Sequence, residues 1–178
     1  MSCAKGSIQL YIGNGKGKTT AALGLAARAL GWKHEVFICQ FLKSTPSGEC
    51  AFFSEQPLVS FYRPPMRHAA FIWHQSPQEL AETREDLIAG WQHARQSVLT
   101  GRYRLAILDE VLDAAACCFI PESELVELIK TKPDQTEIVL TGRDASPEIR
   151  ELSDYLSVID SKKHPFDSGY AARKGIEY

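Results

Sequence analysis

The sequence has 178 residues, of which 44% are hydrophobic and 24% are charged, and its formal net charge is −2. These proportions are typical of a globular protein, and the length predicts a single domain, residues 1–178, with its own core. The balanced charge argues against a nucleic-acid partner, and no apolar run is long enough to cross a membrane. Because the N-terminus lacks the apolar stretch of a signal peptide, we expect a cytoplasmic protein.

The first predicted element is a strand at residues 8–12, followed by the glycine-rich sequence G-N-G-K-G-K-T-T and a helix at residues 20–31. Strand, glycine-rich turn and helix are the context that a phosphate-binding loop requires, because glycines let backbone N–H groups approach oxyanions. Lys18 is predicted to reach the phosphates, and the Thr19 hydroxyl to contact Mg²⁺. The predicted nucleotide-binding residues are Gly13, Asn14, Gly15, Lys16, Gly17, Lys18, Thr19 and Thr20.

This loop departs from the usual spacing. The common pattern is G-x-x-x-x-G-K-[ST], but counting back from Gly17 puts Ile12 at its first position, so the loop is one residue short. The alternative is a glycine turn that carries surface lysines. The position between a predicted strand and a predicted helix favours the phosphate-binding interpretation.

Residues 36–41 are an apolar run suited to a buried parallel strand, which Gln40 and Lys43 close at its C-terminal end. Ligands of parallel α/β sheets gather at that edge, so Lys43 is either a site residue or a solvated lysine. Residues 44–65 are rich in Pro, Ser and Gly, and they contain only one predicted strand, at 58–62.

Residues 66–75 are predicted to form a loop that carries Phe71, Ile72 and Trp73. Large apolar residues on a loop either fold onto the core or contact an apolar ligand, and composition alone favours the core. A helix is then predicted from Ser76 to Gly101, with Ser as N-cap, Pro at its first position and Glu placed for a capping box. Trp91 is expected in the core, and His93 at the surface.

Residues 105–110 form an apolar strand that ends in Asp109 and Glu110. After a phosphate-binding loop, a carboxylate at this place would face the bound Mg²⁺, directly or through water. The alternative is a solvated acidic turn. Asp113 is a weaker third carboxylate, or a cap of the next helix.

The rest of the chain alternates between helices, at 121–132 and 146–152, and strands, at 137–143 and 155–159. Such alternation predicts a three-layer α/β fold like that of P-loop NTPases, with a mostly parallel sheet covered by helices on both faces. The tail from residue 162 to 170 is too polar for the core.

The sequence has five cysteines at scattered positions, so no disulfide framework is expected. Adjacent Cys117 and Cys118 would point to different sides of a helix, which argues against a shared metal.

Together these stretches resemble the P-loop branch of the ATP:cob(I)alamin adenosyltransferase (corrinoid adenosyltransferase) family, whose phosphate loop is shortened in the same way. The resemblance covers most of the chain from Ser7 onward, with residues 44–65 the poorest part. Beyond the loop it includes residues 21–22, 26–29, 40–43, 71–73, 91–94, 108–110, 141–143, 164–169 and 174–178.

The resemblance implies transfer of the 5′-deoxyadenosyl group from ATP to the Co(I) centre of cob(I)alamin or a precursor corrinoid, with triphosphate leaving. Co(I) is already a strong nucleophile, so the protein has only to align the 5′ carbon and to neutralise the triphosphate. Lys16 and Lys18 would hold a nucleotide that lies reversed compared with usual P-loop enzymes. Thr19 and Glu110 match the family's Mg²⁺ ligands, with Asp109 a supporting partner, although the two carboxylates could exchange roles.

Phe71 and Trp73 match aromatic residues that press on the lower face of the corrinoid and make Co(II) easier to reduce, so the resemblance favours ligand contact over the core. With Lys18, they are the residues that we expect to serve catalysis. The family also implies an electron-donating reductase and a homodimer. Its members usually carry a longer N-terminal segment that helps to cover the corrinoid, so a less complete closure of the site is expected here.

Two rival interpretations remain. A P-loop ATPase or small-molecule kinase would use Glu110 to orient water or a hydroxyl, and would release orthophosphate or a phosphorylated acceptor. A regulatory protein that binds corrinoid and ATP would show tight binding with weak turnover. Adenosyl transfer is distinguished from both by the release of triphosphate.

Overall fold

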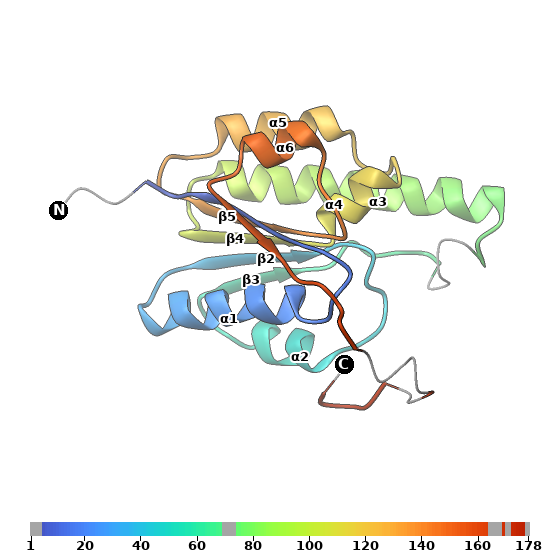
Figure 1. Cartoon of the computed structure of the whole chain (residues 1–178), viewed down its shortest axis with the longest axis horizontal. Helices are drawn as coiled ribbons and strands as arrows, with labels where there is room; N and C mark the ends of the chain where they lie inside the picture. The colour runs from blue at the N-terminus through green and yellow to red at the C-terminus, as the bar shows by residue number, and fades with distance from the viewer. Residues whose placement is uncertain (1–4, 69–73, 164–168, 170–171, 177–178) are drawn as a thin grey trace.

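The computed structural model describes residues 5–68, 74–163, 169 and 172–176. Its described part is a parallel six-stranded sheet with strand order β3-β2-β4-β5-β1-β6, covered by helices on both faces (Figure 1). The elements are β1 Ile8–Ile12, α1 Lys18–Gly31, β2 Val36–Gln40, α2 Gly48–Ser54, β3 Val59–Tyr62, α3 Pro77–Leu99, β4 Leu105–Asp109, α4 Val111–Ala116, α5 Glu122–Thr131, β5 Glu137–Thr141, α6 Pro147–Glu151 and β6 Tyr155–Val158.

Helices cover the sheet as two unequal layers, so the predicted three-layer α/β class is confirmed. Helices α1 and α2 lie on one face, and α3, α4, α5 and α6 lie on the other (Figure 1). Each layer has its own buried cluster, with Ala22, Ala26 and Phe53 on the first face and Leu87, Trp91 and Leu125 on the second. Strands β2 and β4 are buried along their whole length, because both of their faces are covered.

Helix α3 begins as its sequence predicts. The Ser76 hydroxyl accepts from the backbone N–H of Glu79 at 3.3 Å, and the Glu79 carboxylate accepts from the N–H of Ser76 at 2.7 Å. The helix then runs to Leu99 and buries Trp91, whose indole N–H donates to the carboxylate of Glu124 at 2.7 Å. His93 is exposed, as expected. Among the described residues, no helix is long and apolar enough to cross a membrane.

Two short helices differ from the sequence-based expectations. Residues 44–65 were expected to hold only a strand, but they also form α2, a helix of 7 residues in which only Phe53 is buried. A helix this short gives no recognisable periodicity, and tertiary packing rather than propensity stabilises it. The helical placement of Cys117 and Cys118 is also wrong. Helix α4 ends at Ala116, and Cys118 takes φ 57° in the following turn, because a left-handed residue cannot continue a helix.

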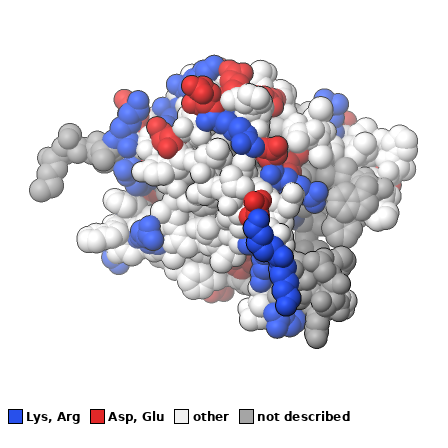
Figure 2. Space-filling model, viewed as in Figure 1, with Lys and Arg blue, Asp and Glu red and all other residues white. Residues whose placement is uncertain are grey.

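Strand β6 forms one edge of the sheet, and its four residues are exposed. Figure 2 shows that the face over which β6 runs is largely uncharged, and Tyr155, Leu156 and Val158 are each about half exposed there. The outer edge of such a strand, with its apolar side chains, is a surface on which another chain can pair.

Candidate functional site

A cavity of about 1510 Å³ opens at the C-terminal edge of the parallel sheet, the place where α/β folds bind their ligands. The glycine-rich loop forms one wall, and the segment after β2, with α2, forms another. The ends of β4 and β5 complete it, together with residues close to the C-terminus. Residues from the glycine-rich loop, the turn after β2 and the ends of β4 and β5 therefore line one cavity.

The glycine-rich loop joins β1 to α1 through two glycines in the left-handed region, Gly13 at φ 115° and Gly17 at φ 119°. A Cβ at Gly13 would lie 2.4 Å from the carbonyl oxygen of Ile159, so both the backbone angle and the close approach require glycine there. Backbone hydrogen bonds to other segments of the chain hold the loop in place. The N–H of Gly13 donates to the Arg143 carbonyl at 2.9 Å, and that of Gly15 donates to the Ile159 carbonyl at 2.7 Å.

The two loop lysines make different contacts. The Lys18 ammonium group donates to the carbonyl oxygens of Gly13 at 2.6 Å and Gly15 at 3.0 Å, so it lies across the loop. The Lys16 ammonium group donates to the carbonyl of Ile176 at 3.3 Å, which connects the loop to the C-terminal segment. Both lysines line the cavity.

Asp109, at the end of β4, is the centre of the hydrogen-bond network, and its side chain is only 2% exposed. Its Oδ1 accepts from the hydroxyls of Thr19 at 2.9 Å and Thr141 at 2.7 Å. Its Oδ2 accepts from the Gln40 amide at 2.9 Å and the Lys43 ammonium group at 2.7 Å. Since four side chains satisfy this buried carboxylate, Asp109 fixes the ends of four elements relative to one another.

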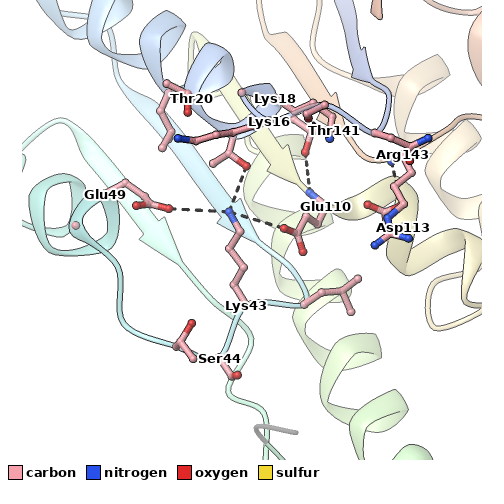
Figure 3. A pocket seen from close by; sticks show the side chains of 18 of the residues that line it. Lys16, Lys18, Thr20, Lys43, Ser44, Glu49, Glu110, Asp113, Thr141 and Arg143 are labelled. Atoms are coloured by element: carbon pink, nitrogen blue, oxygen red, sulfur yellow. Dashed lines mark hydrogen bonds and ion pairs between the residues drawn. The ribbon is translucent and has the colours of Figure 1, made fainter. Parts of the chain in front are cut away.

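Glu110 follows Asp109 but lies in a different environment. Its backbone takes the left-handed conformation, φ 59°, and its N–H donates to the Thr141 hydroxyl at 2.9 Å. Its side chain is 32% exposed and borders the cavity, with Oε1 3.9 Å from the Lys43 ammonium group (Figure 3). Burial raises the pKa of Glu110 to about 7; the charge of Lys43 opposes this shift and that of Asp109 adds to it.

The donor set here fits a hard divalent cation. The Thr19 hydroxyl and the two carboxylates are oxygen ligands, which Mg²⁺ prefers. Among the residues that the structure describes, no group of three His, Cys, Asp or Glu side chains could hold a metal ion. Mg²⁺ usually takes one or two carboxylates and completes its shell with water and phosphate oxygens.

The structure adds residues that sequence reasoning left without a role. Lys43 contacts Asp109, Thr19 and Glu110, so the solvated-lysine alternative is wrong. Thr141 bridges Asp109 to the backbone of Glu110 from β5, the strand that separates β1 from β4. A polar residue that ends an apolar strand was the available signal for Thr141, as it was for Gln40.

Other predicted residues are placed less centrally, or lie outside the described part. Asp113 is on α4, and its carboxylate accepts from the backbone N–H of Arg143 at 3.0 Å, so it organises the turn after β5. Arg143 is exposed and borders the cavity. Phe71 and Trp73, and most of the 164–169 segment, lie outside the described residues.

The sequence is similar to known proteins over nearly its whole length. A family model described as "ATP:corrinoid adenosyltransferase BtuR/CobO/CobP" matches residues 4–178. A corrinoid adenosyltransferase of Escherichia coli strain K12 is 36% identical over 177 residues, which cover 98% of this chain and 86% of that protein. The corrinoid adenosyltransferase CobA of Salmonella typhimurium strain LT2 is 35% identical over 175 residues, with the same coverage.

A more distant likeness concerns the fold alone. The crystal structure of a KaiC-like protein from Pyrococcus horikoshii superposes with a TM-score of 0.51, over 90% of this chain and 75% of that chain. Only 14% of the residues are identical, so this likeness supports the architecture and says nothing about the reaction.

Proposed function

The chain belongs to the ATP:corrinoid adenosyltransferase family, and from this premise we propose that it transfers the 5′-deoxyadenosyl group of ATP to the Co(I) centre of a corrinoid. One observation carries the proposal: the shortened glycine-rich loop and the end of β4 border the same cavity and meet where the Thr19 hydroxyl donates to Asp109 at 2.9 Å, in a chain that matches the family over residues 4–178. The two segments that are proposed to bind the nucleotide thus lie together in a member of that family.

The proposed reaction forms a cobalt–carbon bond and breaks the bond between C5′ and O5′ of ATP. Co(I) supplies both electrons of the new bond, and the electron pair of the broken bond leaves with triphosphate. No protein nucleophile is required, so the side chains serve to orient the nucleotide and to stabilise negative charge on the leaving group. Lys18 would exchange the carbonyls of Gly13 and Gly15 for phosphate oxygens, and Lys16 and Arg143 border the same cavity.

We propose that Mg²⁺ is held by the Thr19 hydroxyl and the Glu110 carboxylate. The partial exposure of Glu110, against 2% for the Asp109 side chain, supports this assignment. Asp109 is already engaged by four donors, and it holds the Thr19 hydroxyl in place. When bound, the ion would neutralise charge on the triphosphate.

The remaining features of the family are proposals as well. Phe71 and Trp73 are proposed to contact the lower face of the corrinoid. An electron-donating reductase is proposed to generate Co(I), and the protein is proposed to work in the cytoplasm. We also propose a homodimer, which the exposed apolar edge of β6 supports, because Tyr155, Leu156 and Val158 leave a surface suited to a second copy.

The decisive test is anaerobic mixing of the protein with Mg-ATP and chemically reduced cobalamin, followed by the corrinoid spectrum and an assay for triphosphate. We expect the spectrum of an alkylated corrinoid and one triphosphate per corrinoid converted. Orthophosphate without a spectral change would support the ATPase alternative instead. Tight binding of ATP and corrinoid without either product would support the regulatory alternative.

A further inference from the structure

We propose that the ammonium group of Lys43 occupies the cation position of the site until Mg-ATP binds, so that Lys43 and a divalent ion compete for the same oxygens. The consequence is an order of binding, in which the metal enters together with the nucleotide and binds only weakly without it. This inference rests on the proposed metal site at Thr19 and Glu110, and it assigns Lys43 a positioning role toward that site.

The contacts of Lys43 are those expected of a cation in this place. Its Nζ lies 2.7 Å from Asp109 Oδ2, 3.2 Å from the Thr19 hydroxyl and 3.9 Å from Glu110 Oε1. Thr19 and Glu110 are the proposed metal ligands, and Asp109 holds the Thr19 hydroxyl in place. Figure 3 shows the Lys43 side chain reaching from the segment after β2, with its ammonium group between Glu49 and Glu110.

The backbone directs Lys43 to this position. After β2 the N–H of Phe41 donates to the Asp109 carbonyl at 2.9 Å, which keeps the chain beside the end of β4. Leu42 then takes φ 52°, a left-handed conformation that residues other than glycine seldom adopt. The turn brings Lys43 back over the strand ends, where its side chain is 21% exposed. Such an unfavourable backbone angle is retained where the surrounding contacts require it.

Electrostatics explain why a positive charge is needed beside the carboxylates of Asp109 and Glu110, whether or not a metal ion is bound. The Asp109 carboxylate is buried, with the Glu110 carboxylate next to it, and a buried charge without a partner is strongly destabilising. Lys43 supplies the compensating charge. A divalent ion at the same oxygens would do so too, but two cations at this separation repel each other, so one must move.

Glu49 provides a second partner for the Lys43 ammonium group. Glu49, on the first turn of α2, has its Oε1 4.0 Å from the ammonium group and lies on the side away from Glu110 (Figure 3). The phosphates of ATP would bring further negative charge into the same cavity. A metal that arrives alone must displace Lys43 toward Glu49 only, whereas Mg-ATP supplies new partners for the displaced ammonium group. This difference is the physical basis for the proposed order of binding.

The test measures metal binding without nucleotide or corrinoid, and Mn²⁺ is the probe. Free Mn²⁺ is counted by electron paramagnetic resonance during titration of the wild-type protein and of Lys43→Met. We expect Lys43→Met to bind one Mn²⁺ at least about tenfold more tightly than wild type, a difference of ~1.4 kcal/mol. Lys43→Arg keeps the positive charge and is expected to bind Mn²⁺ as weakly as wild type.

A matched control is Lys130→Met, which removes an exposed lysine on α5 that pairs with Glu148 at 2.9 Å, far from the cavity. It is expected to leave Mn²⁺ affinity unchanged. Equal affinities for wild type and Lys43→Met would overturn the inference, and so would the absence of Mn²⁺ binding in every variant. Because no corrinoid is present, these results are independent of whether the protein transfers an adenosyl group.

Thermal unfolding gives a second readout. In EDTA, Lys43→Met is expected to melt well below wild type, because Asp109 loses its charged partner, and Mg²⁺ is expected to restore most of the loss. The melting temperature of wild type should change little between EDTA and Mg²⁺. If Lys43→Met does not fold, Lys43→Gln carries both measurements, since its amide can still donate to Asp109 without a charge. A Mg²⁺ response equal to that of wild type would contradict the competition.

Discussion

The role of Thr141 can be tested by Thr141→Val, which keeps the side-chain shape and removes only the hydroxyl. That hydroxyl is buried, donates to Asp109 at 2.7 Å and accepts from the backbone N–H of Glu110 at 2.9 Å. The substitution therefore deletes one hydrogen bond to a charged group and leaves one backbone N–H unsatisfied. The two losses together should cost about 3 to 5 kcal/mol of unfolding free energy.

The expected loss is large compared with the total stability of a domain, which is roughly 5 to 15 kcal/mol. It corresponds to a fall in melting temperature of roughly 6 to 20 °C for a chain of this size. Calorimetry and urea unfolding of Thr141→Val measure it directly. The affinity for Mg-ATP should fall as well, because the same hydroxyl holds the backbone of Glu110 and the carboxylate of Asp109.

The control for this prediction is Thr131→Val on α5, where the hydroxyl donates to the Glu127 carbonyl at 2.8 Å but is exposed. Its unfolding free energy is expected to stay within about 0.5 kcal/mol of wild type. If Thr141→Val is as mild as Thr131→Val, the argument that the buried network depends on the Thr141 hydroxyl is wrong.

Three further predictions concern the loop, the aromatic segment and the carboxylate. Lys18→Ala is expected to abolish adenosyl transfer, measured as triphosphate release, because Lys18 is proposed to neutralise the leaving group; near-normal turnover would remove the loop from the mechanism. Trp73→Ala is expected to slow the reaction from Co(II) more than that from pre-reduced Co(I), and equal losses would mean that Trp73 is only structural. Glu110→Gln tests the stability of the protein in EDTA. Burial raises the pKa of Glu110 from 4.5 to about 7, so ionisation of Glu110 destabilises the fold as the pH rises from 4.5 through 7. The variant should therefore match wild type near pH 4 and exceed it at pH 8, by up to about 3 kcal/mol, in urea unfolding; a difference that does not change with pH would contradict this.

Sequence reasoning succeeded where one local pattern carried the information. The buried strands appear as continuous apolar runs, and the capping box of α3 can be recognised from Ser76 and Glu79 alone. The glycine-rich loop lies between β1 and α1, where its order of glycines and lysines places it, and Asp109 stands at the end of the apolar strand β4. In each case the cause of the structure lies within a few neighbouring residues, so the sequence displays it.

Sequence reasoning failed where the cause is a contact between distant segments. Helix α2 depends on burying Phe53 against the sheet, and nothing in residues 44–65 shows that contact. The exposed state of β6 follows from its place at the edge, which is a matter of strand order rather than of composition. The resemblance to the corrinoid adenosyltransferase family includes Lys43 in a matching segment, residues 40–43, but it does not show what Lys43 contacts.

The amino-acid sequence by itself determined the α/β class, the glycine-rich turn between the first strand and helix, the strand that ends in carboxylates and the family to which the chain belongs, because periodicity and motif spacing are local properties. Only the tertiary structure showed that the two carboxylates lie in different environments. Asp109 is buried among donors from α1, β2 and β5 and from the turn after β2, whereas Glu110 is turned by its left-handed backbone toward the cavity. Burial and charge at a strand end depend on which other strand ends lie beside it, and the order of strands in a sheet is set by packing across the whole chain.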